Sequence, residues 1–292
     1  MDFRTEHERI LFVGLNTIDL QFIVNEYPAA NTKVKAKHNE IYVGGPATNA
    51  AIACAYLGAK TDLFSPVGKH SLTDFIADDL NKHGVNLIDP IPEHKCKPVF
   101  ASIITTDHNG ERTIFSYHPE QPEDEHYIPD IDFRNYNMAL FDGFHPAYAL
   151  PIAKMCREAG ITNVLDGGSW KPGLDQLLDY IDIAICSNDF SVPDGNTPEF
   201  VFQHLHQRGI DDIAITRGEH SILLSRKEVR SELEIETVDA VDTLGAGDIF
   251  HGAFCFYYSL SSHFEQALQQ AAAVAGKSCE SLGTRQWMSD KL

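Results

Sequence analysis

The chain has 292 residues, of which 43% are hydrophobic and 22% charged, a composition typical of globular proteins and not of disordered or fibrous ones. Lys and Arg number 23 against 42 Asp and Glu, so the formal charge is −19, which argues against nucleic acid and anionic membranes as partners. No apolar run of about 18 residues predicts a membrane span, and residues 1–10 do not resemble a signal peptide. The six cysteines are widely spaced without a CxxC pair, which favours a reducing, cytoplasmic location.

The N-terminal half predicts a mixture of strands and helices. Residues 10–15 form a short apolar run, typical of a buried strand. Alternating segments at 20–24 and 33–43, and a hairpin at 99–106 and 111–118, predict half-exposed strands. The other predicted elements of this half are a helix at 47–57, a strand at 61–65 and a helix at 71–83.

From residue 138 onward, strand and helix patterns alternate. The predicted strands are 138–142, 162–166, 182–186 and 212–216, and the predicted helices are 147–159, 172–179, 199–208, 246–258 and 264–280. This alternation favours a mainly parallel sheet with helices on both faces. The acidic, proline-rich segment 119–131 predicts a loop within a domain, so we expect one α/β domain over 1–292. A small antiparallel sheet from about 16–43 and 95–118 would form a lid.

The segment 242–248 (DTLGAGD) carries the strongest chemical signal. Its glycines Gly245 and Gly247 flank Ala246 and open directly onto an apolar helix. A helix N-terminus presents unpaired N–H groups and a positive dipole end, so it can hold a phosphate without a basic side chain. Asp248 in the same turn is placed to accept a proton from a hydroxyl. A plain helix cap is the alternative interpretation of these residues taken alone.

Two segments together resemble the ribokinase-like (PfkB) carbohydrate kinases. The segment 242–248 resembles the C-terminal signature of that family. The segment 44–51 (GGPATNAA), about 200 residues earlier, resembles its N-terminal signature. The stretch 241–279 is also similar to the corresponding stretch of ketohexokinases. The resemblance implies a ribokinase-like three-layer α/β sandwich with a small antiparallel β lid, and an ATP-dependent kinase activity.

The resemblance assigns roles in phosphoryl transfer. It implies that Asp248 is the catalytic base and that the backbone of Gly245, Ala246 and Gly247 forms the anion hole. For the sugar, it implies that Asp19 accepts hydrogen bonds from hydroxyl groups. The other residues implied to contact the substrate are Gly44, Gly45, Asn49 and Arg112, the last of these near the phosphates.

The resemblance also implies a nucleotide site, formed by Asn188, Thr216, Gly218, Gly245, Gly247 and Ala272. The implied cofactors are ATP and Mg²⁺, with room for a monovalent cation such as K⁺. No side chains have the spacing of a protein metal site. The family pattern N-x-x-E is broken here, because Ser191 stands where the resemblance expects a glutamate that orders the water shell of magnesium.

We therefore expect an ATP-dependent kinase that phosphorylates a hydroxyl group of a small sugar, with a ketose such as fructose weakly favoured. A nucleoside or vitamin kinase of the same fold is one alternative, and a catalytically silent sugar-binding protein is another. Since the lid strands have open edges that a second copy would cover, we also expect a homodimer formed through the lid.

Overall fold

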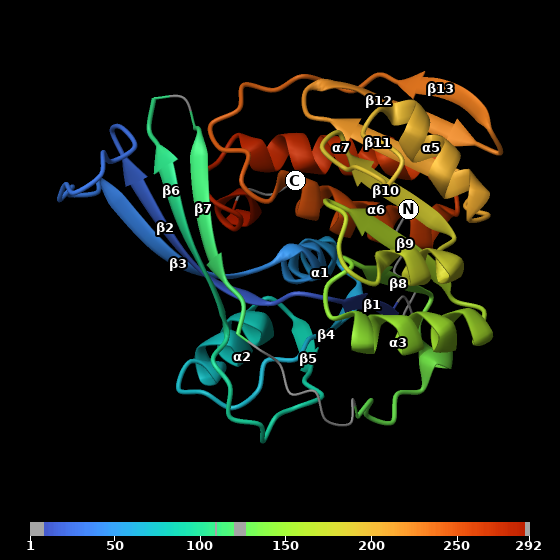
Figure 1. The fold of residues 1–292 in the computed structure, drawn as a ribbon, viewed down its shortest axis with the longest axis horizontal. Coiled ribbons are helices and arrows are strands. Elements are labelled where there is room, and N and C mark those ends of the chain that lie inside the picture. The colour runs from blue at the N-terminus through green and yellow to red at the C-terminus, as the bar shows by residue number, and fades with distance from the viewer. Residues whose placement is uncertain (1–8, 109, 120–126, 290–292) are drawn as a thin grey trace.

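A nine-stranded sheet runs through the centre of the protein (Figure 1). The structure is a computed structural model that describes residues 9–108, 110–119 and 127–289. In spatial order the strands are β13 (Val229–Leu233), β12 (His220–Arg226), β11 (Asp212–Arg217), β10 (Ile183–Ser187), β9 (Thr162–Gly167), β8 (Met138–Phe141), β1 (Arg9–Val13), β4 (Lys60–Phe64) and β5 (Val85–Ile88). The seven strands from β11 to β5 run parallel, so their carboxyl ends meet at one edge of the sheet.

Three strands of this sheet were not expected from the sequence. β5 has only four residues. β12 and β13 extend the sheet as an antiparallel hairpin whose turn is formed by Lys227 and Glu228, with φ angles of 47° and 66°. A two-residue hairpin turn of this kind is usually marked by Asn or Gly, because these residues adopt positive φ easily. Since neither is present, the turn gives no recognisable signal in the sequence.

Helices cover both faces of the sheet (Figure 1) and confirm the predicted three-layer arrangement. One core lies under α1 (Pro46–Leu57), α2 (Thr73–Lys82), α6 (Ala246–Ser261) and α7 (Phe264–Cys279). The other lies under α3 (Pro146–Glu158), α4 (Leu174–Leu177) and α5 (Pro198–Gln207). Short 3₁₀ helices occupy Phe133–Asn135, Leu178–Tyr180 and Gln286–Ser289. No helix in the described part of the chain is both long and apolar enough to cross a membrane.

A second sheet of four strands projects from the main body (Figure 1), and we call it the small sheet. In spatial order its strands are β3 (His38–Gly44), β2 (Thr17–Val24), β6 (Val99–Thr106) and β7 (Arg112–Tyr117). Both outer pairs are antiparallel, as predicted, and the two central strands run parallel to each other. The predicted loop 119–131 lies partly outside the described residues, at 120–126.

Helices α1 and α6 cross at very short distance. A Cβ atom added at Gly252 in α6 would lie 2.1 Å from the backbone oxygen of Ala50 in α1. Only a residue without a side chain fits there, because the atom in the way belongs to the backbone of another helix. Asn49 lies beside Ala50, and Asp248 lies one turn before Gly252, so the crossing brings these two polar residues together.

We predict that Gly252→Ala lowers the free energy of unfolding by about 2 kcal/mol, because the added methyl group forces the two helices apart. Thermal unfolding measures this effect. Gly276→Ala in α7 is the matched control, since its added Cβ would meet only the side chain of Val238, at 3.3 Å. Both changes gain the same helix propensity, so equal stabilities of the two variants would contradict the prediction.

Candidate active site

The first turn of α6 forms the centre of the candidate site. Gly245 precedes the helix with φ 71°, and a Cβ atom there would lie 2.6 Å from the Thr284 side chain. The amide groups of Gly245 and Gly247 have no hydrogen-bond partner among the described residues, whereas that of Ala246 contacts the Thr243 carbonyl oxygen at 3.3 Å. Two of the three amide groups of the predicted anion hole are therefore free to bind a ligand.

Asp248 lies in this same turn and is held by α1. The Asn49 Nδ2 group donates a hydrogen bond to Asp248 Oδ2 at 2.8 Å, across 199 positions of sequence. In the described part of the chain the carboxylate of Asp248 accepts a side-chain hydrogen bond at Oδ2 alone, which leaves Oδ1 available to a ligand. The structure thus brings the predicted base and the predicted sugar-binding Asn49 into direct contact.

The surroundings of Asp248 make it an unusually weak acid. Burial raises the pKa of its carboxyl group to about 7, and the negative charge of Asp166 adds to the shift. The hydrogen bond from Asn49 acts in the opposite direction. A carboxylate with a pKa near neutral is a more effective proton acceptor than one with an ordinary pKa, because it holds the accepted proton more firmly.

Asp19 of β2 projects from the small sheet close to the glycines that end β3. The Thr17 hydroxyl donates to Asp19 Oδ1 at 2.6 Å, and burial raises the pKa of the Asp19 carboxyl group. A Cβ atom at Gly44 would lie 2.0 Å from Asp19 Oδ2, and one at Gly45 would lie 2.4 Å from the Leu15 carbonyl oxygen. Packing therefore requires a glycine at 45, where the atom in the way is backbone, whereas a side chain at 44 would displace the Asp19 carboxylate.

Arg112 connects the small sheet to the DTLGAGD loop. From β7, its Nη1 atom donates to the Thr243 hydroxyl at 3.1 Å and lies 3.7 Å from Asp242 Oδ1. Asp242 in turn accepts hydrogen bonds from the backbone of Leu244 and Gly283. The guanidinium group thus lies beside the DTLGAGD loop.

A largely apolar cavity of about 390 Å³ opens beside the same turn, and its volume is within the range of small-ligand sites. Of the predicted nucleotide-site residues, the cavity lining contains Thr216, Gly218, Ala272 and Gly247. The structure brings these four residues together from β11, the following turn, α7 and α6. Asn188 follows β10, is exposed, and is not among the described residues that line the cavity.

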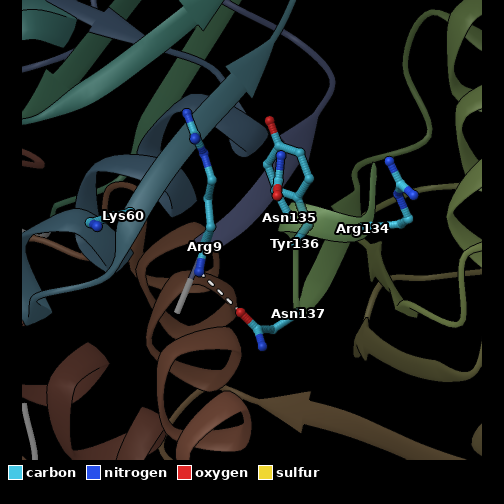
Figure 2. Close-up of a pocket in the computed structure, with 6 residues that line it drawn as sticks. All are labelled: Arg9, Lys60, Arg134, Asn135, Tyr136 and Asn137. Carbon is cyan, nitrogen blue, oxygen red and sulfur yellow. Dashed lines mark hydrogen bonds between the residues drawn. The ribbon is translucent and has the colours of Figure 1, made fainter. Parts of the chain in front are cut away.

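A second cavity, of about 510 Å³, lies at the amino ends of the parallel strands (Figure 2). Its lining is rich in cations, but two of these are paired: Arg9 with Asp62 at 2.5 Å and Arg134 with Asp132 at 2.8 Å. Asp248 lies at the opposite edge of the sheet, where the carboxyl ends of the strands meet. Ligands of open α/β sheets bind at that carboxyl edge, so we place the active site at the first cavity.

Several buried polar residues of the site were not predicted. Asp142, which follows β8, accepts hydrogen bonds from the backbone of Leu15 at 2.8 Å and Ala47 at 3.2 Å, and burial raises its pKa to about 6. Asp166 in β9 is buried, and its Oδ2 atom has no partner among the described residues. Asp142 and Asp166 each stand at the end of a buried apolar strand, and this pattern in the sequence could have identified both residues.

Two further residues had no clear signal in the sequence. The ring nitrogens of His251 lie 2.7 Å from the Gly247 carbonyl oxygen and 3.0 Å from that of Ile185, so the ring ties α6 to β10. Arg285, in the turn after α7, contacts Asn49. Its neighbours in space come from segments that are far away in sequence, and so no local pattern indicates its position.

A buried carboxylate beside free amide groups, next to an apolar cavity, is compatible with a phosphotransferase site. The sequence model of the pfkB family carbohydrate kinases matches residues 7–291, so the chain belongs to this family and is a carbohydrate kinase with a hydroxyl acceptor. Mouse ketohexokinase is 24% identical over 298 residues, 94% of this chain and 97% of its own length. Mouse ribokinase is 25% identical over 296 residues, 96% and 91% of the two chains. The solved structure of a putative ribokinase from Agrobacterium tumefaciens has the same fold, with a TM-score of 0.84 at 24% identity over 98% of this chain and 100% of that one.

We predict that kcat/KM for the acceptor rises with pH up to about 7 and is level above about 8, because the raised pKa of Asp248 leaves its carboxyl group protonated in mild acid. Below pH 7 the rate should fall about tenfold per pH unit. Initial rates at limiting acceptor and saturating ATP·Mg measure this profile. A flat profile between pH 5.5 and 8 would instead indicate a carboxylate with the ordinary pKa of about 4.

Proposed function

We propose that this carbohydrate kinase transfers the γ-phosphoryl group of ATP to a hydroxyl group of a small sugar, with a ketose such as fructose as the preferred acceptor. One observation carries the proposal. The Asp248 carboxylate lies in the same helical turn as the unpaired amide groups of Gly245 and Gly247. A single turn thus offers a proton acceptor and anion donors side by side, which are the groups that phosphoryl transfer to a hydroxyl needs.

The two substrates would enter from opposite sides of this turn. The apolar cavity supports ATP binding, with the adenine against α7 near Ala272 and Thr216 and Gly218 close to the phosphates. The acceptor would lie under the small sheet, where Asp19 accepts hydrogen bonds from vicinal hydroxyl groups. Gly44, Gly45 and Asn49 would line the same pocket.

In the transfer step, the acceptor oxygen bonds to the γ-phosphorus as the bond from that phosphorus to the bridging oxygen of ADP breaks. Asp248 Oδ1 takes the proton from the hydroxyl group, since Oδ2 is already bound by Asn49. The unpaired amide groups of Gly245 and Gly247 and the positive end of the α6 dipole stabilise the charge on the group in transfer. Arg112, which lies against the same loop, adds a positive charge.

Magnesium bound to ATP would shield the charge of the phosphates. Such an ion would be held mainly by phosphates and water. Asp166, with its unpartnered buried Oδ2 atom, and Asn188 are the residues that we propose to hold the water shell. Asp166 would then supply a carboxylate in place of the glutamate that is absent at Ser191. For a monovalent cation such as K⁺ we propose no ligand.

The preference for a ketose rests on the ketohexokinase-like stretch 241–279 and on the similarity to mouse ketohexokinase. Mouse ribokinase matches at nearly the same identity, so ribose belongs among the acceptors to be tested.

We predict ADP release by the wild-type protein with ATP·Mg and at least one sugar in a panel of ketoses, aldoses and nucleosides, with K⁺ present. Asp248→Asn is the matched control: it keeps an oxygen for the Asn49 hydrogen bond, yet cannot take up the proton. We expect this variant to bind ATP and sugar and to lose about 10³-fold or more in kcat. A folded, ATP-binding protein that turns over no sugar would contradict the proposal, and turnover of nucleosides alone would indicate a nucleoside kinase.

We also propose that two copies associate through the small sheet. On the face opposite Asp19, a row of side chains runs from Ile41 across β2 and β6 to Phe115, beside Tyr117. These three side chains are 49%, 57% and 59% exposed. A second copy that packs on this face would bury them.

If two copies associate in this way, light scattering after size exclusion should give twice the chain mass at micromolar concentration. Phe115→Glu should give a monomer, because it buries a charge at the interface. Lys154→Glu, at an exposed position of α3, is the control and should remain dimeric. A monomeric wild-type protein would contradict this proposal and leave the kinase assignment intact.

A further inference from the structure

A single arginine from the C-terminal turn holds the partner of the base. Arg285 Nη1 donates a hydrogen bond to Asn49 Oδ1 at 3.0 Å, and Asn49 Nδ2 donates to Asp248 Oδ2 at 2.8 Å. The three side chains therefore form a chain of hydrogen bonds that runs from a guanidinium group, through an amide, to the base. They come from the C-terminal turn, α1 and α6.

The direction of the Asn49 amide matters, because its two ends have nearly the same shape and opposite hydrogen-bonding character. With the amide reversed, its oxygen would face the Asp248 carboxylate, and two acceptors would oppose each other. A guanidinium group carries only donors, so it can bind the oxygen end of the amide and not the nitrogen end. The contact with Arg285 thus selects the one orientation in which Asn49 donates to Asp248.

Arg285 is itself firmly placed. Its Nη1 atom also donates to the Thr284 hydroxyl at 2.8 Å, and its Nη2 atom donates to the Val43 carbonyl oxygen at the end of β3. The buried Trp287 indole donates to the Thr284 carbonyl oxygen at 3.1 Å, which fixes the turn. The guanidinium group therefore joins the small sheet to the base through Asn49.

Charge supports the same interpretation. Burial lowers the pKa of Arg285, whereas the carboxylates of Asp79, Asp19 and Asp248 act to raise it. An arginine remains protonated at neutral pH even in such surroundings. The guanidinium group that faces Asn49 is therefore always a hydrogen-bond donor.

We propose that Arg285 is a positioning residue for phosphoryl transfer, which acts through Asn49 to hold the Asp248 carboxylate in place. Its contact with the end of β3 links that carboxylate to the small sheet. This inference rests on the proposed role of Asp248 as the base. It adds to that role a residue from a part of the chain that neither of the two sequence signatures contains.

A double-mutant cycle tests the proposal. Arg285→Met in the wild-type background should lower kcat about tenfold or more, with the KM for ATP changed by less than about twofold. In the Asn49→Ala background, where the amide is already absent, the same change should lower kcat by less than about twofold. Arg134→Met, at the opposite edge of the main sheet, is the matched control and should leave kcat unchanged. An equal loss of kcat from Arg285→Met in both backgrounds would overturn the proposal.

Two further measurements cover the remaining outcomes. If Arg285→Met does not fold, Arg285→Gln takes its place in the cycle, because its amide can bind either end of the Asn49 side chain, cannot select one orientation and should show the same coupling. If the wild-type protein turns over no acceptor, the role of Asp248 as base fails, and a crystal structure of the Arg285 variant then decides the inference. An Asn49 side chain turned away from Asp248 would support the positioning contact, and one left in place would overturn it.

Discussion

The close crossing of α1 and α6 is the constraint on which the rest of the site depends. At Gly252 the two helices approach until no side-chain atom fits between them, and the backbone of Ala50 fills the space. This contact places Asn49 against Asp248 although the two residues lie 199 positions apart in sequence. Since both helices also form one of the two hydrophobic cores, the geometry of the base is tied to the global stability of the fold.

A chain with a formal charge of −19 should repel ATP, which is itself strongly anionic. Positive groups close to the proposed phosphate position offset this repulsion. Backbone amide groups at the start of α6 and the single side chain of Arg112 provide positive potential where the phosphates would lie. Buried carboxylates surround Asp248, and their effect on its pKa strengthens the base. In the proposed reaction the acidic surroundings would favour proton uptake from the acceptor, while the amide groups would bind the phosphate.

The sequence predicted the parts of the fold and site that have a local pattern. The DTLGAGD segment marked the start of α6, and the glycines at 44 and 45 marked the start of α1, so Asp248 and Asn49 could both be predicted as site residues. The hairpin of β12 and β13 was missed because Lys227 and Glu228 occupy turn positions that usually hold Asn or Gly. Arg285 was missed for a different reason: its importance arises only from contacts with distant segments. Periodicity and turn chemistry carry no information about such contacts.

The junction between the small sheet and the main body has a mechanical consequence. Strand β3 ends at Gly44 and α1 begins at Pro46, so Gly45 alone connects the strand that borders Asp19 to the helix that carries Asn49. Peptide planes are rigid, and one residue offers only two soft dihedral angles. Gly45, at φ 100°, is a residue type for which a wide range of those angles is accessible. Any rotation of β3 relative to α1 must therefore occur about this single joint. A movement of the small sheet over a bound acceptor would therefore require the backbone at Gly45 to turn.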